Sequence, residues 1–437
     1  MILELISGGF MKRAFIIISV VLFILMLSTA AYAETPNINA PSYILIDSKT
    51  GQILYEKNPN EKLYPASATK IMTAILALEK GNLDQLMTAS QAAVYEIGVG
   101  GSNIGIMAGE EVRLEDLLNA MLMKSANETA NIVAENLAPS RREFVEMMNK
   151  RALELGAVNT NYVNPCGLFD PNHYTTVSDF SKIARYAMTL PKFREIVCKE
   201  TYKMPPTNMH SKWDILPTTN KILKSSSSFY TGMTGIKTGY TSQAGYSFVA
   251  SAVNNDGMEL IGIILSLKTP SADRDIFNFS KELLECGFRN FSIQKFVDDK
   301  TVITNVPVMN SAQDESLDLV TAGELTTVLP NEKIDWNIKG TVNININAIA
   351  PIKEGEILGY IDYERNGYYL GRLDLAASKS IAENVESRFA QKSQVFKVDP
   401  LYLKTLVIII LLIALYLGLK YYLHKSIRYT RIKSDEE

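Results

Sequence analysis

In the first half of the chain, two short apolar runs are followed by a series of helical patterns. The runs at residues 43–46 and 52–55 flank a polar turn and predict a β-hairpin. The segment 67–80 is apolar nearly all round and stops at Gly81, so we expect this helix in the middle of a domain. Further helices are predicted at residues 112–123, from 128 onward, at 144–155 and at 178–188.

Strand patterns return in the middle of the chain. Apolar runs at residues 234–240, 245–253 and 258–267 predict three strands, and the Asn-Asn-Asp-Gly sequence ending at Gly257 is a strong turn signal between the last two. A helix at 273–285 then closes this part of the chain. Two earlier stretches are predicted to be irregular, namely a surface excursion at 85–109 and a turn-rich loop at 164–176.

The pattern changes again from about residue 291. Apolar and polar residues alternate at 334–338 and 342–346, and Arg365-Asn366-Gly367 is a tight hairpin turn. We therefore predict a separate all-β domain at 291–377, followed by a polar stalk at 378–400.

The N-terminus has the pattern of a signal peptide, residues 1–33. Two basic residues, Lys12 and Arg13, precede an apolar run at 14–27 and a small-x-small cleavage site that ends at Ala33. The pattern begins at Met11, which we expect to be the true start. The alternative is an uncleaved N-terminal anchor.

A second apolar run lies near the C-terminus. Residues 405–419 carry no charge, and flanking apolar residues extend the run to a transmembrane helix at 401–423. Basic residues follow it, so the positive-inside rule predicts a cytoplasmic tail at 424–437 and places everything before the span on the extracytoplasmic side of the cell membrane. The alternative, an interfacial amphipathic helix, needs a charged face that this stretch lacks.

The composition of the chain argues against several classes of function. The chain has 437 residues, is 47% apolar and 21% charged, and carries a net charge of −3, which gives no electrostatic basis for binding nucleic acid. Three cysteines without C-x-x-C spacing exclude a disulfide scaffold and a zinc ribbon, and we expect all three to be buried. No sequence motif indicates a metal or another cofactor, so we predict none.

Ser67 and Lys70 are the first candidates for catalysis. They lie three residues apart where a helix is predicted to begin, so their side chains share a face. A serine becomes a nucleophile when a neighbour takes its proton, and a lysine does this only when burial or a nearby cation keeps its amine neutral. The alternative for Ser67 is a helix cap, and Ser292 with Lys295 has the same spacing.

Two later motifs strengthen the first. Ser125 and Asn127 form S-x-N between two helices, although Ser125 with Glu128 is also a capping box. The K-T-G sequence occurs at 237–239, where it begins an apolar strand, and at 49–51, in a polar turn that we regard as a decoy. The order S-x-x-K, S-x-N, K-T-G is the motif set of serine β-lactamases and penicillin-binding proteins.

These motifs and their surroundings resemble the low-molecular-mass penicillin-binding proteins that act as serine-type D-alanyl-D-alanine carboxypeptidases. The resemblance extends over 38–290, through the stretches 53–58, 64–79, 219–221 and 235–246, and more loosely over the β domain. It implies a mixed α/β (α+β) fold, a penicillin-binding or serine β-lactamase-like sandwich of an antiparallel sheet with helices, with the serine helix in the middle.

The resemblance also implies the roles of individual residues. Ser67 would be the acylated nucleophile, Lys70 its general base, kept neutral with help from Lys237, and Ser125 the proton relay to the leaving D-alanine. The substrate would be bound by Asn127, Lys237, Thr238, Gly239 and Tyr240, with the backbone N–H groups of Ser67 and Tyr240 as the oxyanion hole. Arg274 would be a further helper, whose alternative is a surface ion pair with Asp273 or Asp275. His173 and His210 are interpreted as structural.

The function predicted is hydrolysis of the terminal D-Ala-D-Ala bond of peptidoglycan stem pentapeptides, with β-lactam antibiotics as acylating inhibitors. One alternative is a β-lactamase, for which the loop 164–176 offers only Asp170 and no glutamate to activate the deacylating water. Others are a DD-endopeptidase using the same site and a non-catalytic wall-binding protein. The oligomeric state is not predicted.

Overall fold

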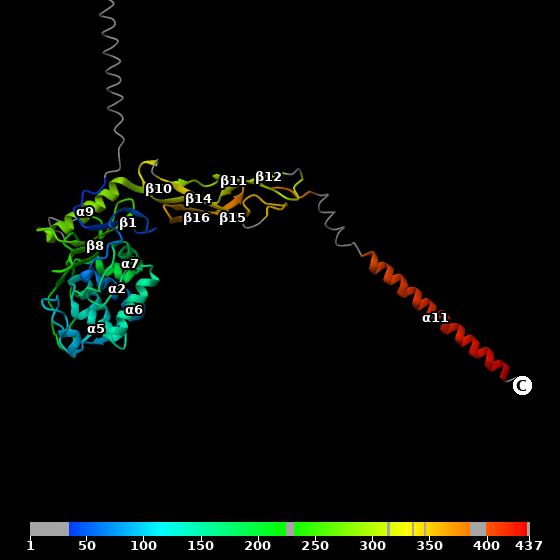
Figure 1. The fold of residues 1–437 in the computed structure, drawn as a ribbon, viewed down its shortest axis with the longest axis horizontal. Coiled ribbons are helices and arrows are strands. Elements are labelled where there is room, and N and C mark those ends of the chain that lie inside the picture. The colour runs from blue at the N-terminus through cyan, green and yellow to red at the C-terminus, as the bar shows by residue number, and fades with distance from the viewer. Residues whose placement is uncertain are drawn as a thin grey trace, which may run out of the picture. The chain divides into compact units, whose positions relative to one another are not determined.

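The computed structural model describes residues 35–223, 231–312, 315–333, 336–344, 347–384 and 399–434 (Figure 1). The predicted signal peptide and most of the predicted stalk lie outside these residues. The chain forms two compact units. Unit 1 holds the described residues up to Phe296 together with Thr326–Lys339 and Tyr363–Gly371, and unit 2 holds the described remainder.

An antiparallel sheet of five strands forms the centre of unit 1. Its order is β2 (Ile53–Lys57), β1 (Ser42–Asp47), β9 (Glu259–Leu267), β8 (Gly245–Val253) and β7 (Met233–Thr241). The predicted hairpin and the three predicted strands are all present within this sheet. The N-terminal hairpin joins the later strands because β1 pairs with β9, with Tyr43 opposite Ile264.

Helices cover both faces of this sheet, because its strands are apolar on both sides. On one face Ile44 and Ile263 pack with the buried residues of several helices, and on the other Leu45 and Ile264 pack against α9 (Ala272–Asn290). Figure 1 shows α9 on the opposite side of β1 and β8 from the other helices. These are α2 (Lys70–Lys80), α4 (Leu114–Asn119), α5 (Asn127–Leu137), α6 (Arg141–Glu154), α7 (Val177–Thr189) and α8 (Pro191–Val197).

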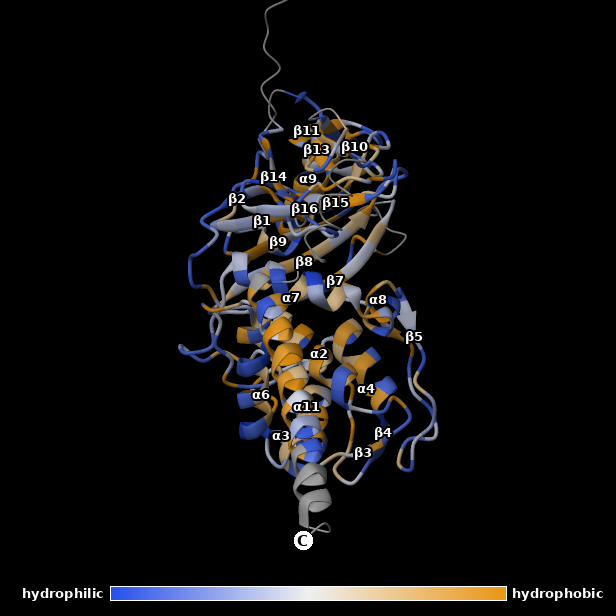
Figure 2. Ribbon diagram, turned by 90° about the vertical axis from the view of Figure 1, so that its right-hand side faces the viewer, coloured by the Kyte–Doolittle hydropathy of each residue, from blue (hydrophilic) through white to orange (hydrophobic). Residues whose placement is uncertain are grey.

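Helix α2 lies in the middle of the helical layer, as predicted. Every residue from Lys70 to Ala77 is buried, and Figure 2 shows hydrophobic colouring in the layer of helices to which α2 belongs. Its predicted first turn is a separate 3-10 turn, Ala66–Thr69. The helix predicted at 112–123 likewise changes form, since α4 passes into a π-helical turn at Ala120–Lys124.

The stretch 85–109 is more than a surface excursion. It contains β3 (Leu86–Thr88), which pairs with β4 (Glu111–Arg113), and a short helix, α3 (Gln91–Tyr95). Its irregular part, residues 96–105, contacts the start of α5 through hydrogen bonds described below. The pattern did not predict this because irregular backbone has no apolar period.

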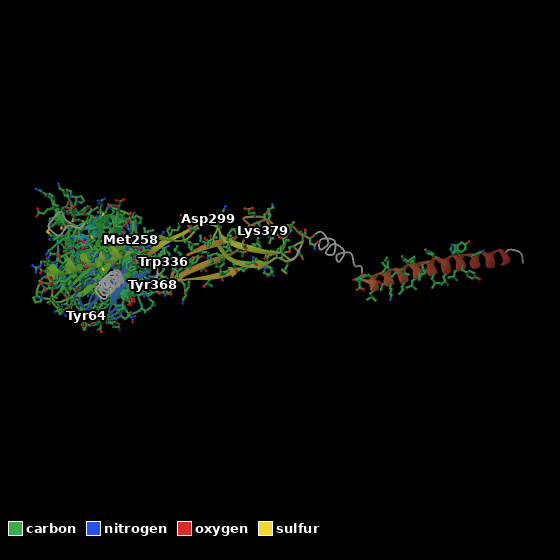
Figure 3. The ribbon with its side chains drawn as sticks, turned by 90° about the horizontal axis from the view of Figure 1, so that it is seen from above. Tyr64, Met258, Asp299, Trp336, Tyr368 and Lys379 are labelled. Atoms are coloured by element: carbon green, nitrogen blue, oxygen red, sulfur yellow. The ribbon has the colours of Figure 1, made fainter. Side chains whose placement is uncertain are left out.

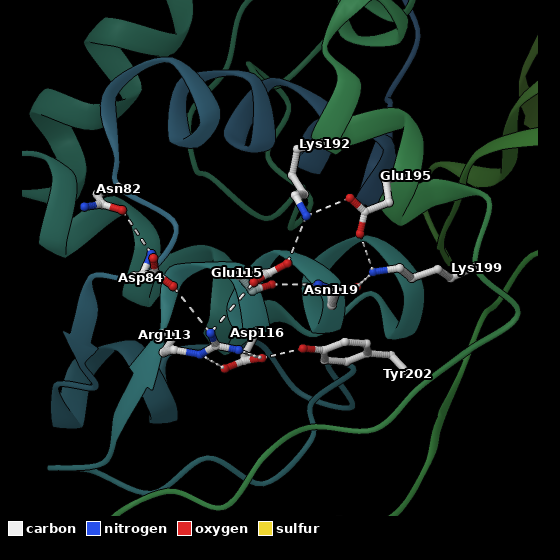
Figure 4. A network of polar contacts seen from close by, with 10 residues as sticks. All are labelled: Asn82, Asp84, Arg113, Glu115, Asp116, Asn119, Lys192, Glu195, Lys199 and Tyr202. Atoms are coloured by element: carbon white, nitrogen blue, oxygen red, sulfur yellow. Dashed lines mark hydrogen bonds and ion pairs between the residues drawn. The ribbon is translucent and has the colours of Figure 1, made fainter.

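A network of charged groups joins α4 to α8 (Figure 4). Lys192 at the start of α8 pairs with Glu115 of α4 at 3.0 Å and with Glu195 at 2.7 Å. Asp116, which is buried, accepts from Arg113 at 2.9 Å and from the hydroxyl of Tyr202. The fully buried side chains of Phe193 and Ile196 hold α8 against the core, and the ion pairs add to this packing. Cys198 follows α8 and is exposed, so the prediction that all three cysteines are buried is wrong for this one.

The C-terminal region is all-β, as predicted. Its larger sheet has the order β11 (Val302–Pro307), β12 (Ser316–Thr321), β16 (Tyr368–Ala377), β15 (Ile357–Arg365) and β14 (Ile338–Ile344). Two further strands, β10 (Phe291–Val297) and β13 (Leu325–Pro330), pair with each other.

The last element is a long apolar helix, α11 (Pro400–Ser434). Its segment Leu401–Lys425 is long and apolar enough to cross a membrane. The side chains of this segment project on all sides and are exposed (Figure 3). A helix that is apolar all round and that no other described element covers fits the predicted transmembrane anchor.

Candidate active site

The candidate nucleophile, Ser67, lies in the 3-10 turn that precedes α2. Its hydroxyl does not cap the helix, because the N-cap position is Thr69 and has no side-chain hydrogen bond. Ser67 Oγ instead lies 3.0 Å from Lys70 Nζ. The contact predicted from the spacing is therefore present, and the cap interpretation is wrong.

Lys70 is fully buried and its amine has three oxygen neighbours. Besides Ser67 Oγ, Lys70 Nζ lies 2.7 Å from Asn127 Oδ1 and 2.7 Å from the carbonyl oxygen of Cys166. The amide and carbonyl oxygens only accept hydrogen bonds. A neutral amine that donates its two N–H groups to them has one lone pair left, and that lone pair faces the Ser67 hydroxyl. The geometry thus orients a base toward the serine proton.

Burial lowers the pKa of Lys70 to about 8, while the nearby Cys166 thiol and Glu128 carboxylate act in the opposite direction. Lys237 is also fully buried, and burial, followed by the charge of Lys70, lowers its pKa well below the usual value. Burial is therefore the main cause of the lowered pKa of Lys70. We predicted that repulsion between the two lysines would lower the pKa of Lys70, but this repulsion acts chiefly on the pKa of Lys237.

Ser125 and Asn127 stand at the junction between the π-helical turn and α5. Ser125 ends the turn in a left-handed conformation with φ +66°, which turns the chain sharply into the next helix. Helix α5 begins at Asn127 without a side-chain cap, and the Glu128 carboxylate accepts from Ile104 N–H at 2.6 Å. The capping-box interpretation of Ser125 with Glu128 is therefore wrong.

Asn127 links Lys70 to the irregular segment 96–105. Its side-chain oxygen accepts from Lys70, its side-chain nitrogen donates to the carbonyl of Ile97 at 2.9 Å, and its backbone N–H donates to the carbonyl of Ser102 at 2.7 Å. All three contacts use different groups of one residue, so the amide is held in a single orientation beside the base.

The second K-T-G sequence lies on β7, an edge strand that packs against the turn of Ser67. A side chain at Gly239 would lie 2.9 Å from the carbonyl of Pro65 and 3.2 Å from Ser67 N, so glycine permits this close approach. Thr238 shares a hydrogen bond with the hydroxyl of Thr219 at 2.7 Å. Lys237 Nζ donates to the carbonyl of Thr238 at 3.0 Å.

The first K-T-G sequence is a turn, as predicted. Thr50 donates both its backbone N–H and its hydroxyl to the Asp47 carboxylate, at 2.7 and 2.6 Å. The motif therefore closes the hairpin between β1 and β2 and has its hydroxyl occupied.

Tyr240 and Arg274 complete the predicted site residues. The ring of Tyr240 is half exposed and packs on Tyr246 with centroids 4.3 Å apart. Arg274 is exposed in the first turn of α9, and no hydrogen bond among the described residues brings its guanidinium to Ser67. Hydrogen bonds from Ser271 and Thr269 lower the pKa of the Asp275 carboxyl, and the nearby charge of Arg274 adds to this effect. The role of Arg274 stays a prediction.

A loop that sequence reasoning did not assign to the site supplies one of the acceptors of Lys70. Asn164 Oδ1 accepts from the backbone N–H groups of Gly167 at 2.7 Å and Leu168 at 3.0 Å, and this holds the turn that presents the Cys166 carbonyl. Gly167 has φ +85°, and a Cβ atom there would lie 1.9 Å from the carbonyl oxygen of Ala66. The Asn-Pro-Cys-Gly sequence predicts a turn, but it does not predict which residues the turn contacts.

The histidines take structural places in the described residues. His173 accepts from Val163 N–H through Nδ1 and donates from Nε2 to the Thr69 hydroxyl at 2.8 Å. Burial lowers the pKa of His173 to about 4, so its ring is neutral at physiological pH. His210 lies 2.8 Å from buried Glu110. Among the described residues no cluster of histidine, cysteine and carboxylate side chains could hold a metal ion.

Comparison with known proteins gives two family matches that together cover most of the chain. The model described as D-alanyl-D-alanine carboxypeptidase matches residues 29–269, and the model described as penicillin-binding protein 5, C-terminal domain, matches residues 291–383. The first of these alone covers more than half of the chain.

Relatives and solved structures agree with these matches. D-alanyl-D-alanine carboxypeptidase DacF of Bacillus subtilis is 32% identical over 78% of this chain and 86% of its own length. DacC of Escherichia coli is 30% identical over 83% of this chain and 90% of its own. The structure of penicillin binding protein 5 from Haemophilus influenzae, 28% identical, has a TM-score of 0.62 and covers 80% of this chain and 100% of that one.

Proposed function

Because the chain belongs to the D-alanyl-D-alanine carboxypeptidase family of penicillin-binding proteins, we propose that Ser67 is its acylated nucleophile and Lys70 its general base. The activity is that of a serine peptidase acting through an acyl-serine. The observation that carries the assignment is the 3.0 Å contact between Ser67 Oγ and a buried lysine whose other neighbours are two fixed acceptors.

In the acylation step Lys70 takes the proton of the Ser67 hydroxyl as its oxygen attacks the carbonyl carbon of the penultimate D-alanine. The C–N bond to the last D-alanine breaks, and the leaving nitrogen receives a proton relayed through Ser125. Water then attacks the acyl carbon and releases the shortened peptide and the free serine. Asn127, fixed by its contacts to Lys70 and Ile97, is placed to hydrogen-bond the substrate peptide.

The strand β7 is assigned to substrate binding. Lys237 and Thr238 would hold the terminal carboxylate, and the backbone N–H groups of Ser67 and Tyr240 would stabilise the oxyanion, each typically contributing about 3 kcal/mol. The close packing of Gly239 on the turn of Ser67 supports this, because it brings the strand beside the nucleophile. A carboxylate bound at Lys237 also offsets the cost of burying an ammonium group. Arg274 is retained as a more distant helper.

The substrates proposed are stem pentapeptides ending in D-Ala-D-Ala. β-Lactams bind the same serine as acylating inhibitors. The β-lactamase alternative is weakened by Asp170, whose carboxylate accepts from Asn172 N–H at 2.7 Å within its own turn. An endopeptidase activity on cross-linked peptides remains the second candidate, because it would use the same bond type and the same residues.

A defined pentapeptide tests the proposed reaction. The purified chain is expected to release one D-alanine per peptide, and the tetrapeptide product is expected to be stable. Free D-alanine and the peptide masses are measured over time, with a peptide ending in L-Ala-L-Ala as the control. Cleavage of cross-linked dimers without release from the pentapeptide would instead assign the endopeptidase activity.

We also propose that α11 anchors the chain with its catalytic domain outside and its C-terminus in the cytoplasm. The segment Leu401–Lys425 is long enough to span, and basic residues follow it. Protease added to intact cells should remove the catalytic domain and spare an epitope at the C-terminus. Protection of the catalytic domain until the cells are opened would reverse the orientation.

A further inference from the structure

Glu128 is a buried carboxylate at the start of α5 that the proposed reaction does not use. Its side chain is almost completely buried, and one oxygen accepts from the backbone N–H of Ile104 at 2.6 Å. The other oxygen, Oε2, has no hydrogen-bond partner among the described residues. A buried carboxylate with only one satisfied oxygen is costly, so its place calls for a physical reason.

One reason lies in the segment 96–105, which forms the wall beside Asn127. This segment has no regular structure and is attached to the first turn of α5 at three places. Ile97 and Ser102 accept from Asn127, and Ile104 donates to Glu128. Within the segment Gly101 must be glycine, because a Cβ atom would lie 2.2 Å from the carbonyl of Ile97. Glu128 thus fastens the far end of a segment whose near end orients Asn127.

The other reason is charge. The titratable groups whose charges act on the pKa of Lys70 are the Cys166 thiol and Glu128, and Lys70 in turn lowers the pKa of Lys237. Burial raises the pKa of the Cys166 thiol, so this group stays neutral at physiological pH. Glu128 and Lys70 favour each other's charged forms, because Glu128 raises the pKa of Lys70 and Lys70 lowers the pKa of Glu128 against the larger effect of burial.

We propose that Glu128 is a positioning residue of the acylation step, which fastens the 96–105 segment so that Asn127 is held against Lys70 and which places a negative charge beside that amine. The proposal rests on the assignment of Lys70 as the base. It concerns how readily Lys70 takes the serine proton at a given pH, and it assigns Glu128 no contact with the substrate.

The test is the pH dependence of acylation by a chromogenic β-lactam. In the wild type the rate constant should rise with pH and level off above about 8, because the neutral amine is the active form. Glu128→Gln keeps an acceptor for Ile104 N–H and removes the charge, which lowers the pKa of Lys70. We expect the rise to move to lower pH by at least about half a unit. At pH 6.5 the rate of the variant, relative to its own plateau, should then be roughly threefold higher than that of the wild type.

Glu110→Gln is the matched control. Glu110 is fully buried, accepts from the backbone N–H of Met107 at 2.9 Å, and pairs with His210 rather than Lys70. Its pH profile should match the wild type. A Glu128→Gln profile that coincides with both would overturn the role of the charge.

Glu128→Ala tests the fastening of the segment. Losing the acceptor for Ile104 should lower the plateau rate about tenfold or more, as expected for one lost hydrogen bond to a charged group. Glu128→Gln keeps the acceptor, so its plateau should stay within about threefold of the wild type. Equal plateaus for the two variants would contradict this part. If Glu128→Ala does not fold, the plateau of Glu128→Gln decides, because a tenfold fall with the acceptor for Ile104 kept would contradict the fastening. Failure of the wild type itself to acylate would instead contradict the proposed function.

Discussion

Replacing Ser67 by alanine is expected to abolish covalent labelling by a fluorescent penicillin. Among the described residues, Ser67 carries the hydroxyl that lies within hydrogen-bond distance of Lys70 Nζ, so we expect the proposed base to activate this serine. Removal of a serine nucleophile lowers turnover on the order of 10⁴- to 10⁶-fold, so both labelling and D-alanine release should fall below detection. Labelling is measured on a denaturing gel after incubation with the purified chain.

Ser292→Ala is the matched control for this experiment. Ser292 begins the other S-x-x-K sequence, but it lies on β10, where its hydroxyl donates to Asn331 Oδ1 at 2.8 Å. This variant should label like the wild type. Persistent labelling of Ser67→Ala would show that the nucleophile is another residue.

Lys70→Ala should be nearly as damaging to acylation. Without the amine the Ser67 hydroxyl keeps its proton, and general-base catalysis is typically worth about 10²- to 10⁴-fold. The fold should survive, because the loss of two hydrogen bonds is offset by the removal of a group that is costly to bury. The rate constant with penicillin and the circular dichroism spectrum are measured together.

Lys80→Ala serves as the comparison for Lys70→Ala. Lys80 ends the same helix and is exposed, so its loss removes a positive charge from α2 without touching the serine. Wild-type acylation is expected for it. Wild-type acylation by Lys70→Ala would instead remove the lysine from the proton transfer.

The sequence predicted the parts of the molecule that depend on local spacing. The contact of Ser67 with Lys70 follows from three residues along one helical face, and the strands of the central sheet follow from continuous apolar runs. The decoy at Thr50 was recognisable because its neighbours are polar. In each case the determining residues lie within a few positions of one another.

The parts that the sequence did not predict depend on contacts between distant segments. The Cys166 carbonyl reaches Lys70 across 96 residues, and a backbone oxygen leaves no mark in the sequence. Glu128 fits a capping box in its local pattern, yet its carboxylate accepts from Ile104, which lies 24 residues earlier. Arg274 follows the K-T-G sequence along the chain, but no contact among the described residues places it at the site. Such contacts depend on the tertiary fold rather than on the hydrophobic period or the secondary-structure propensity of the sequence.

The turn at Asn164–Leu168 gives penicillin labelling a second use. Because Gly167 lies against the carbonyl of Ala66 and the neighbouring Cys166 carbonyl accepts from Lys70, the proposed site of Ser67 and Lys70 is complete only after segments about 100 residues apart have met. A partly folded chain with an intact α2 would carry both Ser67 and Lys70 and still not react. The amount of penicillin that binds therefore counts the chains in which the helical layer has closed, and a refolding experiment could follow this closure by labelling alone.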